Sequence, residues 1–211
     1  MGFRLIDLNT WRRKEYYLHY MNQVVCTYSM TVDIDITPIS GMRLYPAMLW
    51  LLTDTVNQFE EFRTHQSAEG VGIFDYMCPS YTIFNKETEQ FSVIWTEFDS
   101  DYSVFLQRYE ADCRAYAACE SMFPKKYKPD HAFDVSMLPW QTFSAFNLNV
   151  YGEGTWLLPI FTMGRIYVRE GKTFMPLAIQ IHHAACDGYH VCKFVETLQE
   201  KIMRFPRLDI G

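Results

Sequence analysis

The string HHAACDGYH, residues 182–190, holds the densest group of side chains that could do chemistry. It follows a strand-like run, Thr173–His182, and a helical pattern begins directly after it. If the two-residue alternation of a strand continues, His183 shares a face with Ile179 and Ile181 and is held against apolar packing. A neutral imidazole in such a place can accept a proton near pH 7. The string therefore predicts a general base presented at the end of a strand.

Two other interpretations of the same residues stay open at this point. In the first, the histidine pair only ends a strand, and Asp187 only caps the following helix, as aspartate often does. In the second, imidazole and thiolate groups hold a zinc ion, although their spacing fits no usual finger or HExxH pattern. The metal ligands would then be drawn from His182, His183, Cys186, His190 and Cys192.

Apolar periodicity predicts the elements that must position this string. Apolar residues at three- and four-residue steps predict helices, and short runs rich in β-branched and aromatic residues predict strands. Because helices mix with strands that are adjacent in sequence, the pattern predicts a layered α/β protein with an antiparallel or mixed sheet. The expected helices are Pro46–Phe62, Asp101–Tyr116 and Gly188–Phe205. The expected strands are Thr31–Thr37, Phe91–Glu97, Phe143–Val150, Ile160–Arg169 and Thr173–His182, and a hairpin turn at 170–172 joins the last two. We expect Ala117–His131 to be a surface loop.

Length, charge and cysteine usage exclude several classes of protein. A chain of 211 residues without a linker or repeat predicts a single domain, residues 1–211. A net charge of −6 argues against a nucleic-acid partner, which relies on a basic surface. Apolar stretches reach only about eight or nine residues, whereas a membrane span needs about 20, so no membrane partner is expected. Six scattered cysteines without a CxxC, and no export signal, predict a cytoplasmic protein with reduced thiols.

The full pattern HHxxxDG after a strand resembles the active-site signature of chloramphenicol acetyltransferases. The pattern also occurs in dihydrolipoamide acyltransferases and in peptide-synthetase condensation domains, which are longer or carry further modules. The resemblance to chloramphenicol acetyltransferases runs along almost the whole chain, in segments long enough to argue against a chance match. These segments are NTWRRKEYYLHY, YSMTVDIDIT, RLYPAMLW, VNQFEEFR, YTIFNKETEQFS, VSMLPWQTFSAFNLNV, PIFTMGRIY and MPLAIQIHHAACDGYH.

This resemblance implies a reaction and a role for each matching catalytic residue. His183, the second histidine of the pair, matches a general base that takes the proton from the primary hydroxyl of chloramphenicol. The hydroxyl oxygen would attack the thioester of acetyl-CoA directly in a ternary complex. Ser136 matches a donor that stabilises the oxyanion, and Thr162 matches a residue that aids the transition state through a bound water.

The resemblance assigns Asp187 to the architecture of the site. In the family this carboxylate pairs with an N-terminal arginine and is not the partner of the catalytic imidazole. Arg13 aligns best with that arginine, and Arg12 is the adjacent rival. Removing one member of such a pair leaves an uncompensated charge, so we expect Arg13 and Asp187 to hold the His183 loop in place.

The resemblance also implies the assembly and the ligands. It indicates a two-layer sandwich with a mixed, largely antiparallel sheet covered by helices, a homotrimer with active sites at subunit interfaces, acetyl-CoA as co-substrate, and no metal. Residues that match the acceptor pocket are Tyr20, Val24, Cys26, Tyr28, Leu148 and Trp156. Departures from the family at Tyr28, Trp156, Ala185 and Tyr189 could reshape that pocket. Alternatives are therefore an acyltransferase with another acceptor, or a non-catalytic ligand-binding protein.

Overall fold

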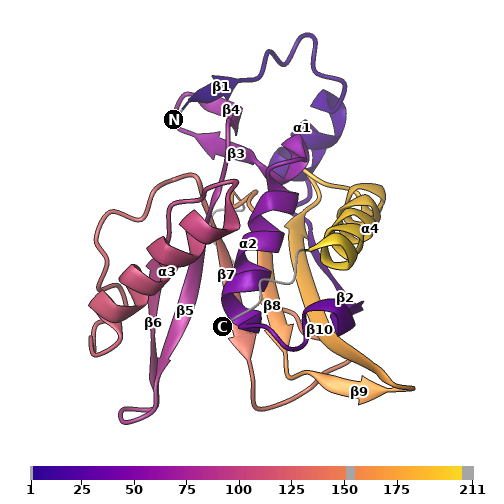
Figure 1. Ribbon diagram of the computed structural model, residues 1–211. Helices are drawn as coiled ribbons and strands as arrows, with labels where there is room; N and C mark the ends of the chain where they lie inside the picture. Colours follow the sequence, from indigo (N-terminus) through magenta and orange to yellow (C-terminus); the bar gives the residue numbers. More distant parts are fainter. Residues whose placement is uncertain (1, 151–154, 206–211) are drawn as a thin grey trace.

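A seven-stranded mixed sheet forms the centre of the computed structural model, which describes residues 2–150 and 155–205 (Figure 1). The parallel pairs are β5–β7 and β7–β8, and the other pairs are antiparallel. The predicted fold class, α/β with a mixed and largely antiparallel sheet, is therefore confirmed. In spatial order the strands are β2 (Thr27–Asp35), β10 (Lys172–His182), β8 (Ile160–Gly164), β7 (Ala132–Leu138), β5 (Cys78–Asn85) and β6 (Gln90–Trp95), with β9 (Tyr167–Arg169) paired to β10.

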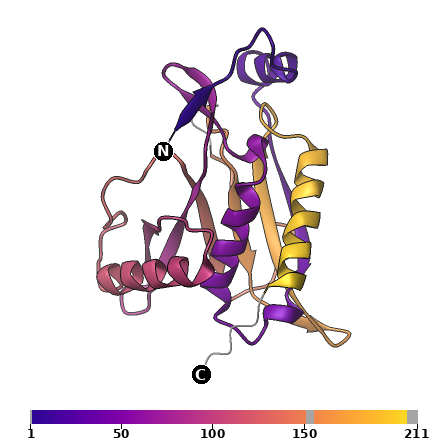
Figure 2. The ribbon, with the colours of Figure 1, turned by 45° about the horizontal axis from the view of Figure 1, so that its top comes forward.

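Three helices cover one face of this sheet. They are α2 (Leu44–Val56), α3 (Tyr102–Tyr116) and α4 (Gly188–Arg204), and both views show them on the same side (Figures 1 and 2). The apolar faces of the helices bury against the sheet. For example, the fully buried rings of Phe161 on β8 and Phe194 on α4 stack with centroids 5.2 Å apart. Burial of such large aromatic side chains supplies much of the stability of a core.

A smaller unit lies beyond one end of the main sheet, at the top of Figure 1. It consists of helix α1 (Lys14–Asn22) and a three-stranded antiparallel sheet in the order β1 (Phe3–Leu5), β4 (Gly70–Phe74) and β3 (Thr64–Ser67). The 3₁₀ turns Thr37–Ile39 and Glu60–Phe62 lie in connections. β10 points its carboxyl end toward this unit, so α1 is placed beside the turn that follows His182.

Local sequence patterns predicted the positions of several elements correctly. Asp101 caps α3 by accepting a hydrogen bond from the N–H of Ser103 at 2.7 Å, so that helix starts one residue after the predicted range opens. Glu170 and Gly171 both have positive φ (52° and 77°) and connect β9 to β10, as the predicted hairpin requires. The segment Ala117–His131 contains neither helix nor strand, as predicted.

Other predicted elements were wrong, because contacts between residues distant in sequence determine the backbone there. Residues 143–150 do not form the predicted strand: Phe143 packs over Gly164, and the N–H of Phe146 donates to the hydroxyl of Thr31 instead of to a neighbouring strand. The predicted helix Pro46–Phe62 ends at Val56, because the Asn57 side chain binds the backbone of Met77.

The remaining differences concern strand ends and elements without a local signal. The predicted strand Ile160–Arg169 is divided into β8 and β9, since the N–H of Arg165 donates to Gln141 between them. The predicted strand Thr31–Thr37 begins four residues earlier, at Thr27, because β2 pairs with β10 along its whole length. The elements β1, α1, β3, β4, β5 and β7 were not predicted from the sequence.

Candidate active site

His183 lies where β10 stops and the turn to α4 begins. Its N–H donates to the carbonyl of Cys26 at 2.8 Å, which continues the pairing between β10 and β2 by one residue. Its imidazole stacks on Tyr20, with ring centroids 4.3 Å apart and 6° between the planes, and the Tyr28 ring lies 5.3 Å away at 66°. Rings from α1 and β2 therefore fix the orientation of the imidazole.

Arg13, immediately before α1, makes four hydrogen bonds to the turn that contains His183. Its guanidinium donates to both carboxylate oxygens of Asp187 at 2.6 Å, and to the carbonyls of His183 at 2.7 Å and Ala184 at 2.9 Å. Of the two adjacent arginines, Arg13 is the one that pairs with Asp187. Its hydrogen bonds outweigh partial burial and hold the pKa of the Asp187 carboxyl below its ordinary value. The carboxylate is therefore ionised near neutral pH.

Asp187 also lies against two histidines. Its Oδ1 is 3.1 Å from Nδ1 of His183, but the atoms are not aligned for a hydrogen bond, and Nδ1 has no hydrogen-bond partner among residues 2–150 and 155–205. This carboxylate is thus closer to the imidazole than the family resemblance implied. The N–H of Asp187 donates to Nδ1 of His190 at 2.9 Å, at the start of α4. Because Nδ1 of His183 is buried, Nε2 is the nitrogen that can meet a substrate.

Ser136 on β7 and Thr162 on β8 form a hydroxyl pair elsewhere in the sheet. The two residues are opposite each other in parallel register, and their hydroxyl oxygens are 3.1 Å apart. Thr162 is only 2% exposed, whereas Ser136 is partly exposed. Ser136 can therefore use its hydroxyl toward a ligand while Thr162 supports it from within the sheet.

Strand register separates this hydroxyl pair from His183. Thr162 is opposite Ala178 of β10, and His183 lies five residues further along, about 16 Å at the usual rise of about 3.3 Å per residue. Thr162 and Ala178 also face away from the helices. Ile181 is in the helix-covered core, and His183, two residues later, shares its face of the strand. Within one chain, His183 and Ser136 cannot act on the same bond.

The predicted pocket residues divide into two groups. Tyr20, Cys26 and Tyr28 contact His183, as described above. Burial raises the pKa of the Tyr28 phenol, so this ring stays neutral. Val24, between α1 and β2, is half exposed.

The other two predicted pocket residues, Leu148 and Trp156, lie on either side of residues 151–154, which are outside the described part of the chain. Leu148 is exposed, and Trp156 has a buried Nε1 without a hydrogen-bond partner in the described residues. Among the contacts of the described residues, none joins this pair to His183.

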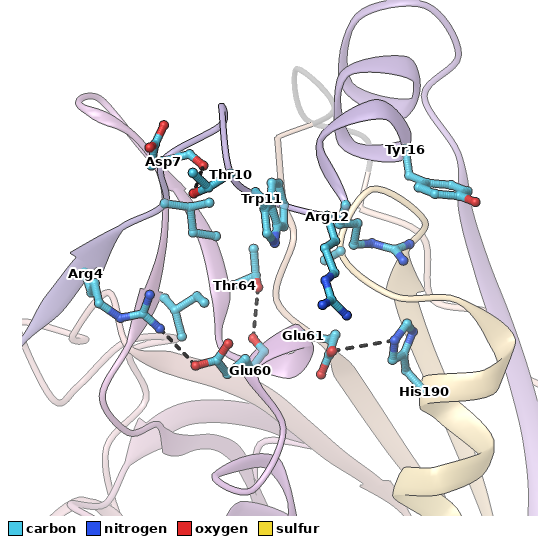
Figure 3. A pocket seen from close by; sticks show the side chains of 14 residues that line it. Arg4, Asp7, Thr10, Trp11, Arg12, Tyr16, Glu60, Glu61, Thr64 and His190 are labelled. Atoms are coloured by element: carbon cyan, nitrogen blue, oxygen red, sulfur yellow. Dashed lines mark hydrogen bonds and ion pairs between the residues drawn. The ribbon is translucent and has the colours of Figure 1, made fainter.

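Arg13 also lines a cavity of about 520 Å³, which is the pocket drawn in Figure 3. Arg12 and Glu61 line it, and Oε1 of Glu61 is 3.5 Å from Nε2 of His190. None of the six predicted pocket residues lines this cavity. It therefore borders the structural support of the His183 turn and not the predicted acceptor pocket.

Two features of the region around these residues were not predicted from the sequence. The carbonyls of His183 and Ala184 accept hydrogen bonds from Arg13, but backbone acceptors leave no signal in residue type. A second cavity, of about 930 Å³, is lined by Met137, Pro139 and Trp140, directly after Ser136. The exposed Trp140 after a proline in the segment VSMLPW was the signal that could have indicated it.

Comparison with solved structures identifies the fold as that of acetyltransferases. A chloramphenicol acetyltransferase superposes with a TM-score of 0.79 at 21% identity, covering 95% of this chain and 100% of that one. A dihydrolipoamide acetyltransferase from Azotobacter vinelandii superposes with a TM-score of 0.65 at 14% identity, covering 88% and 85%. Both enzymes thus share the sheet and helices described here.

Sequence comparison then identifies the family. The family model "Chloramphenicol acetyltransferase" matches residues 1–199. A chloramphenicol acetyltransferase of Vibrio anguillarum is 52% identical over 205 residues, covering 96% of this chain and 95% of the relative. The chain belongs to the chloramphenicol acetyltransferase family. In the described residues, none of the helices is long and apolar enough to cross a membrane.

The Arg13–Asp187 pair predicts a pH-dependent contribution to stability. We expect Asp187→Asn to lower the free energy of unfolding at neutral pH by on the order of 2 kcal/mol, because the partly buried guanidinium loses its charged partner. Since the pKa of Asp187 is lowered in the folded state, its contribution is fully present above the unfolded value of about 3.9 and is lost progressively as the pH falls from there through the lower folded-state pKa. Urea unfolding at neutral pH and near pH 3 measures both effects.

The exposed pair Arg4–Glu60 provides the control for this measurement. Glu60→Gln should change the free energy of unfolding by less than about 1 kcal/mol, because solvent screens an exposed ion pair. Equal losses in the two variants, or a deficit of Asp187→Asn that is as large near pH 3 as at neutral pH, would contradict this account of the pair.

Proposed function

We propose that this protein transfers the acetyl group of acetyl-CoA to the primary hydroxyl of chloramphenicol. The observation that carries the proposal is the imidazole of His183, held by two aromatic rings at the position of the HHxxxDG base, with Nδ1 buried so that Nε2 is the nitrogen that faces a ligand. Identity of 52% to a chloramphenicol acetyltransferase over nearly the whole chain supports the choice of substrates. The cytoplasmic location expected from the sequence is part of this proposal.

The geometry around His183 supports its role as general base. Nε2 takes the proton of the acceptor hydroxyl while the hydroxyl oxygen attacks the thioester carbonyl. The tetrahedral intermediate then collapses with release of the CoA thiolate, which takes up the proton from the imidazolium. Asp187, with Oδ1 3.1 Å from Nδ1, stabilises the positive charge that the ring carries during the step. Ser136, supported by Thr162, donates to the oxyanion of the intermediate.

We further propose that each active site combines His183 of one copy with Ser136 and Thr162 of another. The separation of about 16 Å along β10, on opposite faces of the sheet, supports this division. The half-exposed apolar side chains of Val24 and Leu148 gain burial if a second copy covers them. A closed ring of three copies is the assembly that the family resemblance implies, and in it every site is equivalent.

In this assembly the acceptor pocket is formed by Tyr20, Val24, Cys26, Tyr28, Leu148 and Trp156, drawn from two copies. These side chains are mainly apolar and aromatic, which suits a small aromatic ligand. Tyr20 and Tyr28 already contact the base, so an acceptor held against them presents its hydroxyl to Nε2. The pocket thus couples substrate position directly to the orientation of the base.

The cavity of about 930 Å³ beside β7 is the site that we propose for acetyl-CoA. Met137, the residue after Ser136, lines this cavity, so a thioester that extends from the cavity reaches the oxyanion donor. Trp140 is 56% exposed and offers a flat ring on which an adenine can stack. Lys86 supplies a positive charge for a phosphate group.

Loss of the base and loss of the oxyanion donor should both reduce kcat. We expect His183→Ala to lower kcat by about 10²- to 10⁴-fold, and Ser136→Ala by about 10²-fold or more, because each removes transition-state stabilisation. Thiol release from acetyl-CoA, with and without chloramphenicol, measures the rate. Ser103→Ala, an exposed serine at the start of α3, should leave kcat unchanged. A native protein that releases no thiol with chloramphenicol would contradict the acceptor, and full activity in His183→Ala would contradict the base.

Mixed oligomers test whether the site is shared between copies. Co-expression of His183→Ala and Ser136→Ala chains should restore up to about one quarter of native activity, because random mixing gives that fraction of interfaces with both intact groups. Separately purified variants, mixed without exchange of subunits, provide the control and should stay inactive. If co-expressed oligomers recover nothing, the base and the oxyanion donor belong to one chain.

The proposed acetyl-CoA cavity makes a separate kinetic prediction. Trp140→Ala should raise KM for acetyl-CoA several-fold, with a small change in kcat, because it removes stacking remote from the reacting carbonyl. Tyr127→Ala, a 91% exposed aromatic residue outside the cavity, is the matched control. If KM for acetyl-CoA is unchanged, the co-substrate occupies a different surface.

A further inference from the structure

Cys78, Glu97 and His131 form a side-chain cluster that the proposed reaction does not use. Their ligand atoms, one from each residue, all lie within 4.8 Å of one another. Strand pairing brings them together. Ser80 of β5 is opposite Trp95 of β6, so continuing this register places Cys78 opposite Glu97. The N–H of Cys78 donates to the carbonyl of His131 at 2.8 Å, which fixes the third residue beside the first.

His131 is the least expected member of this cluster. Its side chain is only 6% exposed, and neither ring nitrogen has a hydrogen-bond partner within residues 2–150 and 155–205. A buried polar group without a partner costs free energy, so such groups in folded proteins are normally satisfied by water, an ion or another side chain. The imidazole lies beside a thiol sulfur and a carboxylate oxygen, both of which can bind the same ion.

We propose that Cys78, Glu97 and His131 bind a Zn²⁺ ion. Thiolate, imidazole and carboxylate are the three ligand types that zinc uses, and a fourth, open position takes water. Bond lengths of about 2.0–2.3 Å to zinc place ligand atoms about 3.5 Å apart, so separations within 4.8 Å need to close by no more than about 1.3 Å when the ion binds. Glu97 is partly exposed, which gives the ion a route from solvent, while Cys78 is fully buried.

Neighbouring side chains already orient the carboxylate and the imidazole. The hydroxyl of Tyr76 donates to Oε1 of Glu97 at 2.5 Å, which leaves the other carboxylate oxygen for the ion. The ring of Tyr76 meets the imidazole of His131 edge-on, with centroids 5.2 Å apart, and Phe74 lies 6.1 Å from it. Groups that hold ligands in place in this way increase metal affinity.

This site differs from the zinc ligands weighed in the sequence analysis, which came from the string around His183. It lies at the beginning of β5 and β7, and His131, the residue immediately before β7, precedes Ser136 by five residues, about 16 Å. Bound zinc joins the ends of three neighbouring strands, β5, β6 and β7, and so stabilises the part of the sheet that carries Ser136.

Metal titration of the whole protein tests the proposal without relying on enzyme activity. The protein is treated with a chelator, desalted and dialysed against Zn²⁺, and the bound metal is measured by elemental analysis. We expect one Zn²⁺ per chain and a rise of several degrees in melting temperature. Co²⁺ should give a thiolate-to-cobalt charge-transfer absorption that saturates at one equivalent and disappears when Zn²⁺ is added.

Single substitutions assign the ligands. Cys78→Ser and His131→Gln should lose the cobalt absorption and at least ten-fold in zinc affinity, whereas Cys192→Ser, which changes an exposed cysteine, should keep both. If Cys78→Ser does not fold, Glu97→Gln retains the thiol and should still weaken zinc binding. A native protein that binds no zinc overturns the proposal, as does binding that these three substitutions leave unchanged.

Discussion

The bidentate pair between Arg13 and Asp187 is the interaction on which the rest of the site depends. It joins residues 174 positions apart in sequence, and the same guanidinium also holds the carbonyls of His183 and Ala184. Arginine keeps its charge at every pH at which the protein is folded, so the state of the pair is set by the carboxylate alone. Tyr20 follows Arg13 by seven residues, two turns of α1, and therefore lies on the same face of that helix. One anchor thus positions both the backbone of His183 and the ring on which its imidazole stacks.

Sheet register imposes a second constraint. Parallel pairing of β7 with β8 brings the hydroxyls of Ser136 and Thr162 together, but pairing of β8 with β10 keeps both distant from His183. No rotamer can cross a separation of about 16 Å between opposite faces of a sheet. Under the proposed function, a chain that is fully folded is therefore still incomplete, and catalysis depends on association as much as on folding.

The sequence predicted those features that local chemistry determines. The run Thr173–His182, the turn around Asp187 and the helix from Gly188 were predicted because strand alternation, an Asp-Gly turn and helical periodicity follow one another. Features set by contacts between distant residues were not. Phe143–Val150 has the composition of a strand, yet the N–H of Phe146 donates to the side chain of Thr31 on β2, and Phe143 packs over Gly164 of β8.

The same distinction applies to the site. The roles expected for Ser136 and Arg13 came from the family resemblance of their motifs. Spacing in sequence does not show that His183 and Ser136 lie on opposite faces of the sheet, since it carries no information about which strands become neighbours. The cluster of Cys78, Glu97 and His131 shows this still more clearly. These residues are up to 53 positions apart and match no metal-binding spacing. Only the order β6–β5–β7 makes them adjacent.

The residue proposed as the base and the residues proposed to line the pocket differ in how firmly one chain holds them, and under the proposed function this difference affects substrate range. His183 is held by hydrogen bonds and stacked rings within its own chain, so changes at Val24 or Leu148 leave the base in place. Val24 and Leu148 are exposed in the single chain and, under the proposed function, are buried only by another copy. A substitution at either position therefore alters acceptor fit and subunit contact together. Under the proposed function, a change at Trp156 also falls in the pocket and spares both the Arg13 anchor and the rings that hold His183, so acceptor preference can change while the chemistry of the base is retained.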